Sequence, residues 1–250
     1  DLRIYSKDRN LLQKLCPDTY VQSLLPLPNK EILLIGTFNC GVKSISLSSW
    51  QEQPVKNGSL PHTPIRSMIE MTPSTVLLGF DGDGVYTYNL SSGEAEPLFT
   101  RTNRMLTAMG VYSLSRDCED YIWIGTYTGG AFLMMHEETS TTLLRHRKGE
   151  EPSLADDNVN AFCEQSNGEL WIATDNGISI YNPPNNRCRQ ILPGNVVLSI
   201  SIDSQDIIAA GTYGNGVFLL NSQGEILHHY LSTNSSLPSD YLSTVQYDTD

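Results

Sequence analysis

Short apolar segments alternate with polar, glycine-bearing turns along the whole chain. In the clearest example, Leu170–Thr174 carries apolar side chains at successive positions, which is typical of a central strand packed on both faces. The turn Asp175–Gly177 follows, and then Ile178–Tyr181 alternates apolar and polar residues as a half-buried strand does. With Val159–Cys163 before this pair and Cys188–Leu192 after it, the pattern predicts a unit of four strands.

The second strand of this unit recurs five times along the chain. It serves as an anchor near residues 34, 77, 123, 171 and 209, so the repeat length is 38–48 residues, the period of a four-stranded propeller blade. A glycine stands in four of the five anchors, at Gly36, Gly79, Gly125 and Gly211. Because glycine has no side chain, its place here favours close approach between neighbouring sheets.

Partial units stand at both ends of the chain. Leu2–Tyr5 and Leu11–Leu15 match a third and a fourth strand, and residues 237–250 match a lead-in and a first strand, which makes 23 predicted strands. A small sheet cannot bury both faces alone, but blades stacked around an axis can. We therefore predict an all-β fold, a single β-propeller over residues 1–250 built of four-stranded antiparallel blades. Closure with six blades is possible; we favour a slice of a longer protein with a seven-bladed ring.

The units resemble the two-component-regulator propeller repeat. The second-best copy is Ile122–Gly130, the last lead-in at residues 237–242 fits more loosely, and the other units lack the tryptophan. The best copy consists of Leu154, Asn158, Val159, Phe162, Gly168, Leu170–Thr174, Gly177, Ile178, Tyr181 and Asn182.

This resemblance implies a function. Such repeats form the periplasmic sensor region of hybrid two-component histidine kinases of gut bacteria, ahead of a transmembrane helix, a kinase and a DNA-binding regulator. Such sensors commonly detect oligosaccharides released from glycans and signal to a transcriptional response. The resemblance therefore implies a periplasmic ectodomain of an inner-membrane protein, an oligosaccharide ligand and a homodimer formed through the full ectodomain.

Composition and motifs exclude several other functions. The net charge of −12 disfavours nucleic acid and anionic membrane surfaces as partners. No apolar stretch reaches the roughly 18 residues of a membrane span, so we expect membrane attachment only through a segment outside these residues. Five cysteines without a CxxC pair, five histidines without HExxH, and the lack of GxSxG, P-loop and GxGxxG motifs predict no catalytic residue, no metal and no cofactor. We therefore expect this part of the protein not to be an enzyme.

The aromatic residues divide into two classes. Trp123 and Trp171 lie inside anchor strands, which predicts that they pack between blades. Phe38, Tyr127 and Tyr213 each follow the last anchor residue, which places them at loop tips. These three are the aromatics suited to stacking on a sugar.

Topology predicts one functional face. In a four-stranded antiparallel blade, the turn between the second and third strands lies at the same end as the lead-in from the previous blade. Aromatic faces with amides and carboxylates suit a polyhydroxylated ligand. The predicted ligand-binding residues on this face are Phe38, Asp81, Asp83, Arg104, Tyr127, Asp175, Asn176, Tyr213 and Asn215.

Alternatives to this ligand site stay open. The same residues also suit ordinary turns, and the chain would then be a non-catalytic scaffold for protein–protein interaction or dimerisation. The segment Asp81–Gly84 admits a calcium site, but it is too short for an EF-hand, and we favour a tight turn. Carboxylates at the channel mouth also leave room for a lyase or glycosidase, although no general acid partner is recognisable.

Overall fold

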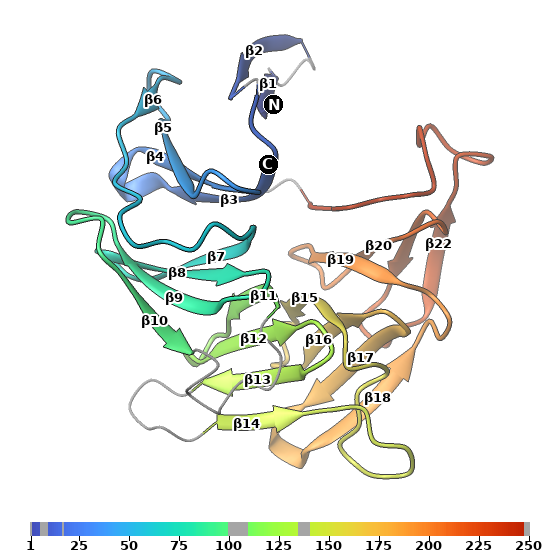
Figure 1. The fold of residues 1–250 in the computed structure, drawn as a ribbon. Helices are drawn as coiled ribbons and strands as arrows, with labels where there is room; N and C mark the ends of the chain where they lie inside the picture. Colours follow the sequence, from blue (N-terminus) through green and yellow to red (C-terminus); the bar gives the residue numbers. More distant parts are fainter. Residues whose placement is uncertain (1, 6–9, 17, 100–109, 135–140, 248–250) are drawn as a thin grey trace. The chain divides into compact units, whose positions relative to one another are not determined.

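The computed structural model describes residues 2–5, 10–16, 18–99, 110–134 and 141–247. Within these ranges the chain forms 22 strands and two 3₁₀ turns of three residues, with no α-helix. The strands make five four-stranded antiparallel sheets and one two-stranded sheet, each in chain order (Figure 1). The prediction of an all-β propeller with five complete blades is therefore confirmed. The chain divides into two compact units, Asp1–Val111 and Tyr112–Asp250; closure in one ring, and a ring of seven blades, stay predictions.

The first unit contains the two-stranded sheet β1–β2 and the blades β3–β6 and β7–β10. Its elements are β1 (Leu2–Tyr5), β2 (Leu11–Leu15), β3 (Val21–Leu27), η1 (Pro28–Lys30), β4 (Ile32–Thr37), β5 (Val42–Ser46), β6 (Glu52–Gln53), β7 (Ile65–Thr72), β8 (Thr75–Phe80), β9 (Gly84–Asn89) and β10 (Ala95–Phe99).

Two apolar clusters hold the sheets of the first unit together. Leu2 and Leu15 of the β1–β2 sheet, and Cys16 directly after it, pack with Ile35 and Ile45 of the first blade. Leu34, Ile65 and Phe80 belong to a second cluster between β3–β6 and β7–β10. At Gly36, an added Cβ would lie 2.9 Å from the backbone oxygen of Ile65. A side chain at this position would therefore push the two blades apart, as the anchor glycine predicted.

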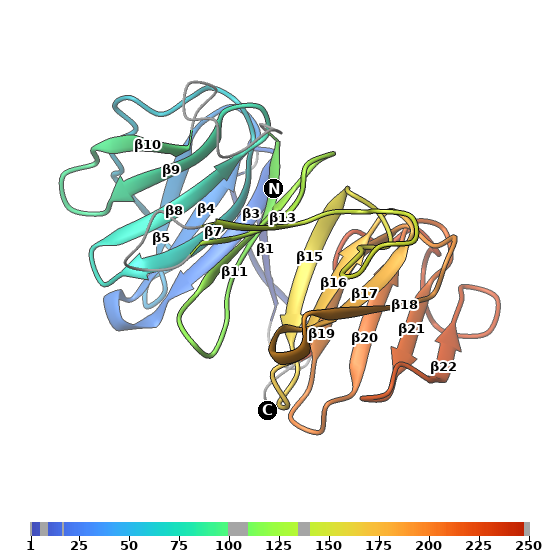
Figure 2. The same ribbon diagram turned by 90° about the horizontal axis from the view of Figure 1, so that it is seen from below.

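The second unit contains three blades, β11–β14, β15–β18 and β19–β22. Its elements are β11 (Val111–Arg116), β12 (Ile122–Thr126), β13 (Gly130–Met134), β14 (Thr141–Leu144), β15 (Val159–Glu164), β16 (Leu170–Thr174), β17 (Gly177–Asn182), η2 (Pro183–Asn185), β18 (Arg187–Ile191), β19 (Val197–Ile202), β20 (Ile208–Thr212), β21 (Val217–Leu220) and β22 (Ile226–Tyr230). Figure 2 shows the sheets β15–β18 and β19–β22 lying side by side.

The two tryptophans of the anchor strands are buried between blades, as predicted. Trp123 is 2% exposed and packs with Leu170 and Tyr181 of the next blade. Trp171 is 0% exposed and packs in the same way with residues of β19–β22. Each indole N–H also donates a hydrogen bond to the side chain six residues earlier in the chain. For Trp123 the acceptor is Asp117 Oδ2, at 2.9 Å. The tryptophans are therefore packing residues between blades.

The C-terminal segment differs from its prediction. We expected a first strand within residues 237–250, but the described part of this segment, up to residue 247, forms only an isolated bridge between Tyr213 and Tyr241. It nevertheless runs along β19, where the backbone N–H of Val245 donates to Ser199 Oγ at 3.1 Å. An added Cβ on Gly211 would lie 2.8 Å from Val245, so the anchor glycine again faces the next unit. The segment has a first-strand position, but no second strand among the residues that the structure describes pairs with it in a ladder.

Candidate functional site

The turns between second and third strands lie beside the lead-ins in both units, as predicted. In the first unit, the backbone N–H of Asp81 donates to the carbonyl of Pro64 at 2.9 Å. In the second unit, the backbone N–H of Asp175 donates to the carbonyl of Asn158 at 3.3 Å, and the backbone N–H of Gly216 donates to the carbonyl of Asp240 at 3.0 Å. At these positions the turn therefore lies at the same end of the blade as a lead-in, and we call this end of the blades in each unit its turn face.

Three aromatic side chains project from the turn face. The exposed fractions are 46% for Phe38, 48% for Tyr127 and 63% for Tyr213. Large apolar side chains are usually covered in folded proteins, so Phe38 in the first unit and Tyr127 and Tyr213 in the second are candidates for contact with a ligand or partner. Their prediction as loop-tip residues is confirmed.

Each of these aromatics has an aromatic neighbour that our sequence analysis did not identify. The signal for them was present, since all three neighbours stand in a lead-in or at the start of a first strand. The pairs, with the distance between ring centroids, are Phe38 with Tyr20 at 6.5 Å, Tyr127 with Tyr112 at 5.3 Å, and Tyr213 with Tyr241 at 5.0 Å. The Tyr127–Tyr112 rings are stacked, and the other two pairs meet edge to face. Such contacts orient the exposed rings.

A charged pair organises the turn face of the first unit. Arg66 donates to Asp81 Oδ2 from Nη2 at 2.7 Å and from Nε at 3.1 Å, and its Nη1 donates to Gln22 at 2.8 Å. Asp83 Oδ2 accepts a hydrogen bond from Thr63 Oγ1 at 2.6 Å. Because the guanidinium of Arg66 is already bound to the Asp81 carboxylate, the geometry favours a tight turn at Asp81–Gly84 over a calcium site. Among the residues that the structure describes, no three His, Cys, Asp or Glu side chains come together as a metal site.

Two asparagine side chains hold Asp175 in the second unit. Its Oδ2 accepts from Asn158 Nδ2 at 2.8 Å, and its Oδ1 accepts from Asn160 Nδ2 at 2.9 Å. Asn160 also donates to the carbonyl of Val197 at 3.0 Å, which joins β15 to the next blade. The carboxylate is therefore held in one orientation, with further lone pairs left for a hydroxyl donor.

The two predicted asparagines are also held by neighbouring loops. Asn176 Oδ1 accepts from the backbone N–H of Gly194 at 2.9 Å. Asn215 Nδ2 donates to Asn195 Oδ1 at 2.8 Å. Both amides stabilise the local backbone, so they would offer a ligand only the donors or acceptors that remain.

The predicted residues thus form two groups. The first unit contributes Phe38, Asp81 and Asp83, and the second contributes Tyr127, Asp175, Asn176, Tyr213 and Asn215. Arg104 lies outside the described residues. That all of these residues ring one channel mouth stays a prediction.

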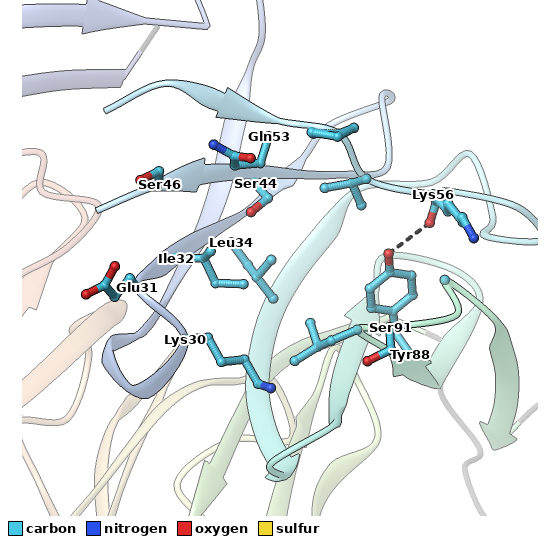
Figure 3. Close-up of a pocket in the computed structure, with 14 residues that line it drawn as sticks. Lys30, Glu31, Ile32, Leu34, Ser44, Ser46, Gln53, Lys56, Tyr88 and Ser91 are labelled. Carbon is cyan, nitrogen blue, oxygen red and sulfur yellow. Dashed lines mark hydrogen bonds between the residues drawn. The ribbon is translucent and has the colours of Figure 1, made fainter. Parts of the chain in front are cut away.

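A cavity of about 420 Å³ lies between the two blades of the first unit (Figure 3). Ile32 and Leu34 supply apolar surface, and Ser44 and Gln53 supply polar groups. The cavity opens beside β6, which is only two residues long. Tyr88 lines the opposite side, where its hydroxyl donates to the carbonyl of Lys56 at 2.8 Å. None of the predicted ligand-binding residues lines this cavity.

The groups with the largest pKa shifts lie away from the turn face. Burial raises the pKa of the Cys163 thiol and of the Cys188 thiol from 9.0 to about 12. Both cysteines belong to blade β15–β18, in β15 and β18. Their thiols stay protonated at neutral pH, which makes them packing groups rather than nucleophiles.

One segment of the chain matches the model of a known family. Residues 153–176 match the family model described as "Two component regulator propeller". The matched segment contains Leu154, Asn158 and Trp171, on which the resemblance depends. No curated protein matches the chain.

Two solved structures with a similar fold are parts of bacterial surface or extracellular proteins. PorZ, a component of the type-IX secretion system of Porphyromonas gingivalis, is 14% identical with a TM-score of 0.71, covering 93% of this chain and 36% of PorZ. The extracellular domain of the putative hybrid two component system BT3049 from B. thetaiotaomicron is 17% identical with a TM-score of 0.57, covering 97% of this chain and 38% of that domain. The chain thus spans little more than a third of either protein, and at these identities the likeness is one of fold. Residues 153–176 thus match the two-component regulator propeller repeat, and the fold of the chain is similar to that of the extracellular domain of BT3049.

Proposed function

We propose that the chain is part of the periplasmic sensor region of a hybrid two-component histidine kinase. In this proposal it detects a glycan-derived oligosaccharide and passes the signal across the membrane to a transcriptional response. The match of residues 153–176 to the two-component regulator propeller is the observation that carries the proposal. The fold shared with an extracellular domain of a putative hybrid two component system supports it.

The chemistry of the turn face suits an oligosaccharide. The pairs Tyr127–Tyr112 and Tyr213–Tyr241 offer exposed rings for the C–H faces of sugars. Asp175 offers a fixed acceptor for a hydroxyl group. Binding sites of this kind combine apolar surface with a few oriented polar groups.

The remaining parts of the sensor are proposals about the whole protein. A transmembrane helix, a kinase and a regulator would follow outside these 250 residues, and the ectodomain would act as a homodimer. Among the described residues, no helix is both long and apolar enough to cross a bilayer. The propeller itself would act by binding and not by catalysis.

A second candidate is a protein–protein interaction scaffold without a ligand. The fold similarity to PorZ, a surface component of a secretion system, supports this alternative. The same exposed tyrosines would then lie in a protein interface, where tyrosine is enriched. Binding measurements separate the two functions.

The test is calorimetric titration of the chain with a panel of oligosaccharides from plant and host glycans. Tyr127→Ala and Tyr213→Ala should each weaken binding by about 1–3 kcal/mol, the scale for burying such a side chain. Tyr230→Ala is the matched control, because Tyr230 is a partly exposed tyrosine on β22. Unchanged affinity in both turn-face variants would remove this face from sensing. If no oligosaccharide binds and the two variants abolish self-association, the scaffold function is correct.

A further inference from the structure

A second cavity lies at the opposite end of the blades from the turn face. Its volume is about 420 Å³, and it lies between the blades β11–β14 and β15–β18 of the second unit. Trp123, Leu133, Leu170 and Tyr181 supply its apolar lining. This size and this apolar content fit a small organic ligand.

The charge of this cavity is unbalanced. Three carboxylates line it, from Asp117, Glu119 and Glu164, and no Lys or Arg does so among the described residues. Glu164 Oε2 accepts from the backbone N–H of Cys118 at 2.8 Å, which fixes this carboxylate in the gap between the blades. The cavity of Figure 3, in contrast, is lined by two lysines and one glutamate. An uncompensated group of carboxylates beside apolar walls favours a cationic guest.

In the next gap, between the blades β15–β18 and β19–β22, an arginine of the chain lies beside the equivalent tryptophan. Arg189 lies over the ring of Trp171, with its guanidinium carbon 5.9 Å from the ring centroid. Its Nη1 donates to the carbonyl of Gln223 at 2.6 Å, and its Nη2 lies 3.4 Å from Glu169 Oε2. In this gap, a cation of the chain itself bridges the blades β15–β18 and β19–β22.

Strand register identifies the equivalent of Arg189 in the preceding blade. Trp171 pairs with Ile180, which pairs with Arg189. By the same register, Trp123 pairs with Leu133, which pairs with Thr142. The position that supplies a guanidinium in one gap is therefore occupied by an uncharged residue type in the other.

The turn before each tryptophan changes in the complementary direction. Gln165 stands six residues before Trp171, whereas Asp117 stands six residues before Trp123. Asn167 is replaced in the same way by Glu119. Tyr121 stands at the position of Glu169. Relative to the next gap, the gap at Trp123 therefore lacks the pair Arg189 and Glu169 and gains the carboxylates of Asp117 and Glu119.

We propose that this cavity binds a small organic cation, a guanidinium, amidinium or ammonium group carried on an apolar body. The cation takes the position that Arg189 occupies beside Trp171, and it hydrogen-bonds to Glu164 and Glu119. The apolar body packs against Leu133, Leu170 and Tyr181. This site is separate from the turn face, so it does not depend on the proposed oligosaccharide function.

The test compares benzamidine with benzamide, its neutral isostere, by calorimetric titration of the 250-residue chain. Benzamidine should bind with one-to-one stoichiometry, and benzamide should bind at least roughly tenfold more weakly, the scale of one charge-assisted hydrogen bond. Equal affinity for the two probes, or no saturable benzamidine binding up to about 20 mM, would overturn the proposal.

Two sets of variants locate the site. Glu119→Gln with Glu164→Gln keeps the shape of the cavity and should weaken benzamidine binding by tenfold or more. The control, Glu150→Gln with Glu225→Gln, removes the same charge at exposed positions of the same unit and should bind as the unchanged chain does. Thr142→Arg puts an arginine at the strand position that Arg189 holds in the next blade, so a folded variant should lose benzamidine binding. Unaltered binding in the first set, or in folded Thr142→Arg, would show that the cation lies elsewhere.

Discussion

Replacement of Trp171 by alanine should destabilise the second unit strongly. The side chain is 0% exposed and lies in the apolar cluster between β15–β18 and β19–β22. Its indole N–H donates to Gln165 Oε1 at 2.9 Å, and Arg189 lies over its ring. The substitution therefore removes apolar packing, one buried hydrogen bond and one cation–π contact together.

The magnitude follows from these three losses. Removal of a large buried aromatic costs about 3–5 kcal/mol, because the gap that remains closes only partly. Gln165 is 5% exposed, so its carbonyl loses a donor where water has little access, at about 1–3 kcal/mol. The cation–π contact adds about 0.5–1 kcal/mol at such a partly exposed site. Since neighbouring losses are not additive, we expect a net loss of about 5 kcal/mol.

Equilibrium unfolding in urea, followed by far-ultraviolet circular dichroism, measures this loss without depending on the deleted fluorophore. Tyr213→Ala is the control, because Tyr213 is 63% exposed and should cost less than about 1 kcal/mol. Transitions from different probes must coincide before a single free energy is fitted. A loss for Trp171→Ala below about 1 kcal/mol would refute the assignment of this residue to packing between blades.

Further predictions follow from the same structure. Gly125→Ala should lose about 1–3 kcal/mol in urea unfolding, because its Cβ would lie 2.7 Å from Val159; Gly58→Ala, with its nearest neighbour at 3.7 Å, should change little, and equal effects would contradict the role of the anchor glycine. The raised pKa of Cys163 predicts that stability is kept below pH 9 and lost as pH rises toward 12, because the unfolded thiol ionises first; Cys163→Ala should show a shallower loss in the same pH series. Addition of EDTA should leave the melting temperature unchanged, whereas a clear drop would revive the calcium interpretation of the β8–β9 turn.

The blade structure could be predicted because its signals are local. The predicted strand Leu170–Thr174 coincides with β16, and its turn and flanking strands follow within a few residues. Apolar runs, alternation and glycine turns act over such short distances that each blade can be recognised alone. The prediction of a first strand within residues 237–250 was wrong. A local pattern identifies residues that suit a strand, but a strand also needs a partner with which to form a ladder.

The candidate site was predictable only in part. Phe38, Tyr127 and Tyr213 were expected to be exposed because each follows an anchor strand, and the structure confirms their exposure. The pairing of Arg66 with Asp81 was not predicted, because Arg66 lies in β7 and Asp81 in the turn after β8, and the two meet only through the register of the blade. The register of the strands decides which charged and polar side chains pair with one another, and the spacing of residues in the sequence does not show these pairs.

The sequence by itself determined the repeat, the strands of the five blades and the burial of the tryptophans. These properties follow from periodicity, from turn chemistry and from the area that small sheets must bury. Only the tertiary structure decided which groups fill the gaps between blades. Trp123 and Trp171 look alike in the repeat, but cross-strand register gives one of them Arg189 as a neighbour and gives the other Thr142 at the same position. Charge balance in each gap is therefore a property of packed neighbours, which meet only after the blades have formed and stacked.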